Sequence, residues 1–142
     1  MSATGLKAFD TTLHSTHIML DDLMRELRWE GDRQKAYHAL RAVLHALRDR
    51  MPVENVAHFA SELPMLVRGF YYEGWTPART PVREHTADEF LVHVTEAFLF
   101  DVNAHSKEIA QAVFRVLSQH ISAGEIDKVK HVLPTGIREL WP

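Results

Sequence analysis

Residues 37–75 read YHALRAVLHALRDRMPVENVAHFASELPMLVRGFYYEGW, and the chain repeats most of this stretch 70 residues later. The hexapeptide LPMLVR at 63–68 returns as LPTGIR at 133–138. At the same offset, apolar residues fall on apolar residues without a gap, as Tyr71 does on Trp141. An ungapped internal repeat of this size predicts one supersecondary unit that is used twice.

The spacing of the apolar residues predicts an all-α protein. Apolar residues recur every three or four positions in both copies, which is the period of one helix face, and no stretch alternates for long enough to make a convincing strand. We expect two tandem copies of a helical unit, packed into one compact domain over residues 1–142. The first copy is expected at 7–72, the linker at 73–86 and the second copy at 87–142.

Two Leu-Pro pairs mark helix boundaries. Proline disfavours the helical conformation in the residue before it, and its own fixed φ suits the first position of a helix. We therefore expect Leu63 and Leu133 to end one helix each, and to be buried in equivalent places about a pseudo-twofold axis. Pro64 and Pro134 should begin the next helices. Two S/T-x-x-E capping boxes should start further helices, at residues 86–89 and 122–125.

Composition limits the classes of function. The net charge is −3, so we expect no nucleic-acid partner, because a non-specific hold on a phosphate backbone needs positive charge. The chain has no cysteine, which excludes disulfides, thiolate zinc sites and cysteine nucleophiles. No apolar run is long enough for a membrane helix, and the first residues do not resemble a signal peptide. We expect a cytoplasmic protein with no membrane partner.

The chain resembles bacterial domain-of-unknown-function family 2267. The segments that carry the resemblance are YHALRAVLHALRDR at 37–50, LPMLVRGFYYEGW at 63–75 and SAGEIDKVKHVLPTGIRELWP at 122–142. The resemblance covers nearly the whole chain, and the paired Leu-Pro-x-x-[Val/Ile]-Arg segments are specific to the family. It implies a small, soluble, all-helical bacterial protein made of two related halves. It implies no activity, cofactor or catalytic residues.

Ten histidines raise the alternative of a metal site. Asp10, His14, His17 and Asp21 are spaced i, i+4, i+7 and i+11, which would place them along one helix face, and imidazole and carboxylate suit zinc, iron or manganese. Charged residues at this spacing are also typical of a solvated helix face. The di-iron bundle pattern of Glu-x-x-His on two helices is absent. The favoured hypothesis is therefore no metal and no cofactor.

A second cluster could carry acid–base chemistry. Glu54 and Glu62 lie one helical turn on either side of His58, and a carboxylate can raise the basicity of a neighbouring imidazole. Because no nucleophile or further site element accompanies the triplet, we interpret it as surface ion contacts. We therefore expect a non-enzymatic protein, with an enzyme as the alternative.

The candidate partner-binding residues are aromatic and basic. Arg68, Phe70, Tyr72, Trp75 and Arg79 lie in or beside the linker, and Trp, Tyr and Arg are enriched at binding hot spots. The repeat gives Tyr72 and Trp75 no counterparts, although Trp75 could instead plug the seam between the copies. We expect a soluble helical module that binds a protein partner or itself. The alternative is a small-molecule or metal-binding protein that uses the histidine faces or a pocket between the copies.

Overall fold

The computed structural model describes residues 3–142, and this part of the chain is all-α, as predicted. It contains eight α-helices and one short 3-10 helix. In chain order these are α1 Lys7–Leu27, α2 Arg33–Arg48, α3 Val53–Ala60, α4 Met65–Tyr72, η1 Pro77–Arg79, α5 Ala87–Glu96, α6 Ser106–His120, α7 Ala123–Val132 and α8 Thr135–Arg138. Within residues 3–142, no helix combines the length and the apolar character needed to cross a membrane.

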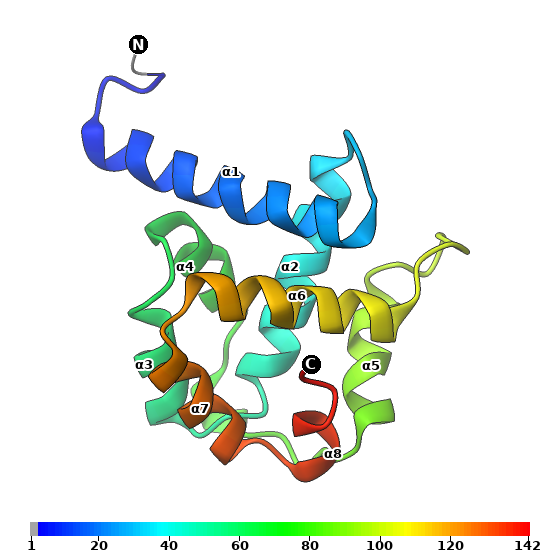
Figure 1. Cartoon of the computed structure of the whole chain (residues 1–142). Coiled ribbons are helices and arrows are strands. Elements are labelled where there is room, and N and C mark those ends of the chain that lie inside the picture. Colours follow the sequence, from blue (N-terminus) through cyan, green and yellow to red (C-terminus); the bar gives the residue numbers. More distant parts are fainter. Residues whose placement is uncertain (1–2) are drawn as a thin grey trace.

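Helices α2 and α6 form the centre of the domain. Helix α1 packs against both of them, and so does α5, while α3 lies beside α7 (Figure 1). The apolar stripes expected from the sequence are the buried faces of the two central helices, which supply Leu40, Val43, Leu44, Leu47, Val113, Phe114, Val116 and Leu117. One continuous apolar core therefore runs through all of the helices.

The two Leu-Pro boundaries have the same geometry. Pro64 has φ −53° and ψ 146°, and Pro134 has φ −55° and ψ 146°. Both Leu63 and Leu133 are buried, which confirms that part of the prediction. These matches are what a duplicated unit would produce, but the duplication itself stays a prediction.

An arginine follows each Leu-Pro pair and ties the new helix to the one before it. Arg68 Nε donates to Ala60 O at 2.9 Å, and its Nη2 donates to Leu63 O at 3.1 Å. Arg138 makes the equivalent bonds, from Nε to Lys130 O at 2.7 Å and from Nη2 to Leu133 O at 2.9 Å. The last carbonyls of a helix have no partner within it, so each arginine caps the preceding helix.

The two predicted capping boxes differ. The box at Thr86 is complete, with the Thr86 hydroxyl and the Glu89 carboxylate bonded reciprocally to backbone amides. The box at Ser122 forms only by half, and the prediction of a full box there is wrong. Ser122 N donates instead to Glu62, in the turn that follows α3, and Glu125 turns inward to the ring of His58. These two side-chain contacts join α3 to α7.

Candidate binding surface

An apolar groove lies between α1, α2 and α4. It has a volume of about 880 Å³. Its apolar lining comes from all three helices and comprises Phe9, Leu13, Leu20, Tyr37, Met65, Leu66 and Phe70. A cavity of this size with a largely apolar wall is the usual form of a binding site.

The groove exists because the apolar face of α1 extends beyond the core. The buried residues of α1 begin at Thr16, yet its apolar stripe starts at Phe9 and continues through Leu13. Phe9 is exposed and Leu13 is half-buried, so the first two turns of α1 overhang α4 (Figure 1). A helix normally buries its apolar stripe against a neighbour. In the first two turns of α1, no neighbouring helix within residues 3–142 fully covers the apolar stripe.

Hydrogen bonds fix the width of the groove. The Leu66 amide at the start of α4 donates to Thr12 Oγ1 of α1 at 2.8 Å, and Thr16 Oγ1 donates to Thr12 O at 2.7 Å. Between α4 and α2, the ring of Phe70 meets Tyr37 edge-on, with centroids 5.2 Å apart and planes at 83°. The groove is therefore a formed feature of the fold and needs no rearrangement of these walls to open.

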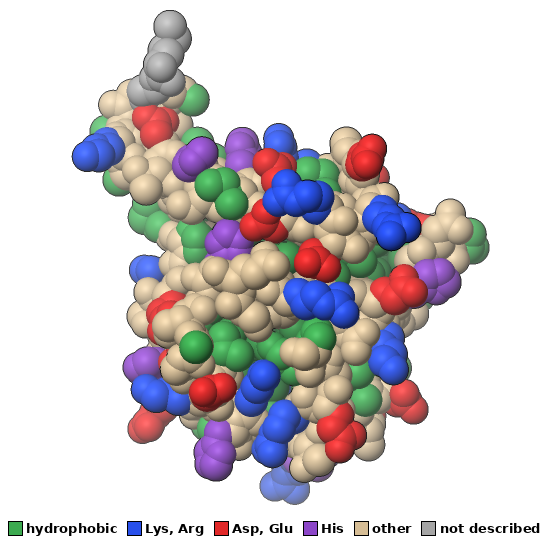
Figure 2. Space-filling model, in the orientation of Figure 1, with side chains coloured by type: hydrophobic (Ala, Val, Ile, Leu, Met, Phe, Trp, Pro, Cys, Tyr) green, Lys and Arg blue, Asp and Glu red, His purple; other side chains and the backbone are tan. Residues whose placement is uncertain are grey.

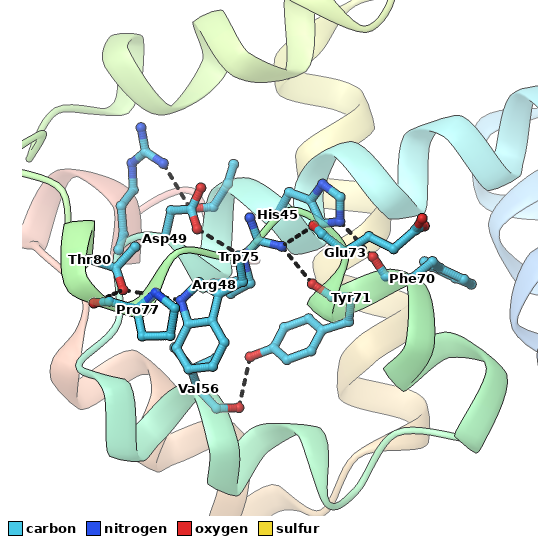
Figure 3. A network of polar contacts seen from close by, with 12 residues as sticks. His45, Arg48, Asp49, Val56, Phe70, Tyr71, Glu73, Trp75, Pro77 and Thr80 are labelled. Atoms are coloured by element: carbon cyan, nitrogen blue, oxygen red, sulfur yellow. Dashed lines mark hydrogen bonds and ion pairs between the residues drawn. The ribbon is translucent and has the colours of Figure 1, made fainter.

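Helix α4, which forms one wall, is held at its C-terminal end by the side chains of Arg48 and His45 of α2. Arg48 donates to Tyr71 O and to Glu73 O, both at 2.8 Å, and His45 Nε2 donates to Phe70 O at 2.6 Å (Figure 3). Arg48 is buried, and its remaining charge is met by Asp49 at 2.8 Å. Two carbonyls in the last turn of α4 and the carbonyl of its C-cap, Glu73, are satisfied in this way.

Two of these groups have shifted pKa values. Burial lowers the pKa of His45, an effect that its bond to Phe70 O partly offsets. Burial also raises the pKa of Tyr71, whose hydroxyl donates to Val56 O at 2.9 Å. Both groups therefore act as neutral hydrogen-bond donors within the wall, and neither lines the groove itself.

The five residues predicted to bind a partner lie in four different places. Arg68 caps α3, and Phe70 is buried with its ring against the groove. Tyr72 and Trp75 stack on each other, with centroids 5.5 Å apart and planes at 29°, and both pack against the core. Arg79 is exposed on η1. As a binding set these residues stay a prediction, but only Phe70 belongs to the groove.

Trp75 is fixed within the linker. Its Nε1 donates to Thr80 Oγ1 at 3.1 Å, and Thr80 Oγ1 in turn donates to Pro77 O at 3.2 Å (Figure 3). The side chain is half-buried. Trp75 therefore combines a packing contact with some exposed ring surface. This is intermediate between a partner-binding residue and a plug in the seam between the copies.

The histidine and carboxylate patterns do not assemble into a metal centre. Within residues 3–142, no three His, Asp or Glu side chains are placed so that they could hold one ion. Of the α1 set, Asp21 pairs with Arg33 at 3.0 Å and Asp10 accepts from Thr4 at 2.8 Å. His14 and His17 are exposed.

The triplet around His58 joins two helices. His58 Nδ1 lies 2.7 Å from the buried Glu125 Oε2, and Glu62 accepts from both the amide and the hydroxyl of Ser122. The Ser122 amide in particular lowers the pKa of Glu62. The two polar contacts connect α3 to α7 and give the triplet a structural role.

Sequence reasoning missed the walls of the groove. The spacing of Phe9 and Leu13 predicts that they belong to a helical stripe, but nothing in the sequence indicates that this end of the stripe stays uncovered. Leu66 occupies a position that is apolar in one Leu-Pro segment and Gly136 in the other. The structure explains the difference: a Cβ at Gly136 would lie 3.3 Å from His85 O, so backbone covers this position in the second segment, whereas Leu66 is 42% exposed in the first.

The comparisons with known proteins are consistent with the resemblance. A family model described as "Uncharacterized conserved protein (DUF2267)" matches residues 16–140. No curated protein matches the chain.

Proposed function

The chain belongs to the DUF2267 family of uncharacterized conserved proteins, and within it we propose that this chain is a non-enzymatic helical module that binds an apolar protein segment in the groove between α1, α2 and α4. The observation that carries the proposal is the uncovered apolar stripe of α1 opposite Leu66 and Phe70. A protein partner or a second copy of the chain would bury this surface.

The dimensions of the groove suit a short peptide segment. From Phe9 to Leu20 the helix α1 rises by about 16 Å, which corresponds to roughly three helical turns. Helix-in-groove recognition uses apolar anchors over about this length. Arg33 and Glu73 also line the groove, so polar groups are present to orient an occupant.

The polar groups of the groove favour binding over chemistry. The Thr16 hydroxyl donates to the Thr12 carbonyl, the Thr12 hydroxyl accepts from the Leu66 amide of α4, and Arg33 is paired with Asp21. A hydroxyl nucleophile would instead need a neighbouring base within hydrogen-bond distance. These groups stabilise the walls, so the apolar side chains are left as the recognition elements.

A photo-crosslinking amino acid at position 66 tests the proposal. Leu66 is 42% exposed inside the groove, and Val92, which is 52% exposed on α5, is the matched control. In cells, the probe at position 66 should form crosslinks to one defined segment of a partner polypeptide. The probe at position 92 should form no such crosslinks. Mass spectrometry of the crosslinked peptide identifies the partner. Equal or no crosslinking at the two positions would contradict the proposal.

A small molecule is the second candidate occupant. A volume of about 880 Å³ lies within the range of small-molecule pockets, roughly 300–1,000 Å³. If the occupant is a small molecule, Leu66→Glu should abolish the thermal shift that the ligand causes, while position 66 forms no crosslink to protein. A cytoplasmic location and the lack of a nucleic-acid partner stay predictions from the sequence.

A further inference from the structure

The connection between α5 and α6 carries an exposed apolar tip. Leu99, Phe100 and Val102 are 68%, 101% and 92% exposed. Figure 1 shows this connection, residues 97–105, projecting from the body of the domain beside α5. Single exposed apolar residues are common, but three within four positions at the end of a projection indicate a contact surface.

The base of this projection is anchored. Asp101 Oδ2 lies 2.7 Å from Lys35 Nζ on α2, and the Asn103 amide donates to Asp101 Oδ1 at 3.0 Å. The hydrogen bond from Lys35 lowers the pKa of Asp101, followed by that from Asn103. Phe98 packs on Trp29 with centroids 5.9 Å apart. Because the base is held, little conformational entropy remains to be lost when the tip binds.

The tip and the groove lie close to each other on the surface. Gln34, in the first turn of α2, lines the α1–α2–α4 groove and also the hollow beneath the tip, which Lys35, His38 and Phe100 line as well. The two features therefore occupy neighbouring sides of one helix end. An apolar projection next to an apolar groove is a self-complementary surface, as a twofold dimer requires.

We propose that two copies of the chain associate about a twofold axis, with the Leu99–Phe100–Val102 tip of each copy seated in the α1–α2–α4 groove of the other. This inference rests on the proposed function, because it names the segment that occupies the groove. The contact is isologous: each copy donates one tip and accepts one. Two such contacts close the assembly, so the association stops at a dimer.

The chemistry of the two surfaces agrees. The groove presents Phe9, Leu13 and Leu66 to the incoming apolar side chains. Asp101, the acidic group that anchors the projection, has its charge met by Lys35 and would be already paired when the tip binds. An aromatic side chain buries about 150–250 Å² in such a site. A standard interface buries roughly 800 Å² per partner, so each copy has to contribute its groove and the surface between tip and groove in addition to Phe100.

Sedimentation velocity on the purified full chain tests the dimer. The variants are Phe100→Asp for the tip, Leu66→Asp for the groove and Val92→Asp as the exposed control. An interface of standard size has a Kd of about 1 μM or tighter, so the wild type should be dimeric above that concentration. Losing one hot-spot contact weakens binding about 30-fold. A homodimer of either variant loses both of its tip–groove contacts, so its Kd should rise by about 1,000-fold. The control should dimerise normally.

Mixing the tip and groove variants gives the decisive result. The intact tip of the Leu66→Asp chain can enter the intact groove of the Phe100→Asp chain, so one of the two contacts is restored. The mixture should therefore form a heterodimer about 30-fold weaker than the wild type and about 30-fold tighter than either variant alone. A third-party occupant of the groove would produce no such complementation.

Each other outcome overturns the inference in a recognisable way. A wild type that stays monomeric well above micromolar concentration refutes the dimer, and crosslinks from position 66 to another protein would then leave the proposed function standing. A dimer that Leu66→Asp breaks and Phe100→Asp does not would place a different segment in the groove. Circular dichroism of Phe100→Asp and Leu66→Asp confirms folding, which the exposure of both positions favours.

Discussion

Replacing Arg68 with Ala should destabilise the protein without involving any partner. The change removes two charge-assisted hydrogen bonds, to Ala60 O at 2.9 Å and to Leu63 O at 3.1 Å. Among the described residues, Ala60 O keeps only its bond from the Leu63 amide, and Leu63 O loses its bond to the side chain. Hydrogen bonds to a charged group contribute about 1.5–3 kcal/mol each. Arg68 is half-buried, so the lower part of the range applies, and we expect a loss of about 2–4 kcal/mol in the free energy of unfolding.

Urea denaturation measures this loss, with Arg79→Ala as the exposed control. Arg68→Lys should recover less than half of the loss, because an ammonium group lacks the planar geometry that reaches two carbonyls at once. Arg138→Ala should cost a similar or smaller amount, since Arg138 makes the equivalent bonds but is more exposed. An unfolding free energy for Arg68→Ala within about 0.5 kcal/mol of the wild type would refute the capping role.

Three further outcomes follow from buried or partly buried groups. Leu63→Ala and Leu133→Ala should each cost about 2–5 kcal/mol in denaturant titrations, as fully buried leucines do; a loss below 1 kcal/mol at either would show that the site is not core. Burial lowers the pKa of His45, so the unfolded chain takes up its proton at a higher pH than the folded one. Stability should therefore fall as the pH drops from about 6.5 towards the lowered pKa, and His45→Gln should flatten this part of the curve measured by thermal melts. A His45→Gln curve parallel to that of the wild type would contradict this assignment. Trp75→Ala should cost about 1–3 kcal/mol, because half of the ring is packed and its stack on Tyr72 adds about 0.5–1.5 kcal/mol; unchanged stability with lost association would move the binding surface to Trp75.

The helices were predictable because each depends on a local pattern. The stripe on α2 and the Thr86 capping box involve residues within a few turns of each other, and both formed as expected. The Ser122 box failed for a reason that is not local. Glu62, far away in sequence, accepts the hydrogen bond from the Ser122 amide, and Glu125 contacts His58 instead.

The groove could not be predicted for the same reason. Its walls come from three helices, and its existence depends on how far α1 extends past α4. The periodicity of Phe9 and Leu13 predicts an apolar face but not what covers it. Arg68 shows the opposite problem, because in the sequence it lies next to aromatic residues and resembles a binding residue. Its two bonds to the backbone depend on a turn geometry that only the fold defines.

The segments in which the two halves differ are those that build the proposed interface. Helix α1 has 21 residues and α5 has 10, and the extra turns of α1 form one wall of the groove. The connection from α5 to α6 spans residues 97–105, against residues 28–32 between α1 and α2, and the additional length carries the exposed tip. Core packing needs neither extension, since the residues of both lie largely outside the buried set. An extension that adds apolar surface without adding core costs solubility, and contact with another polypeptide recovers that cost. A groove in one half and a projection in the other are then two parts of one interface.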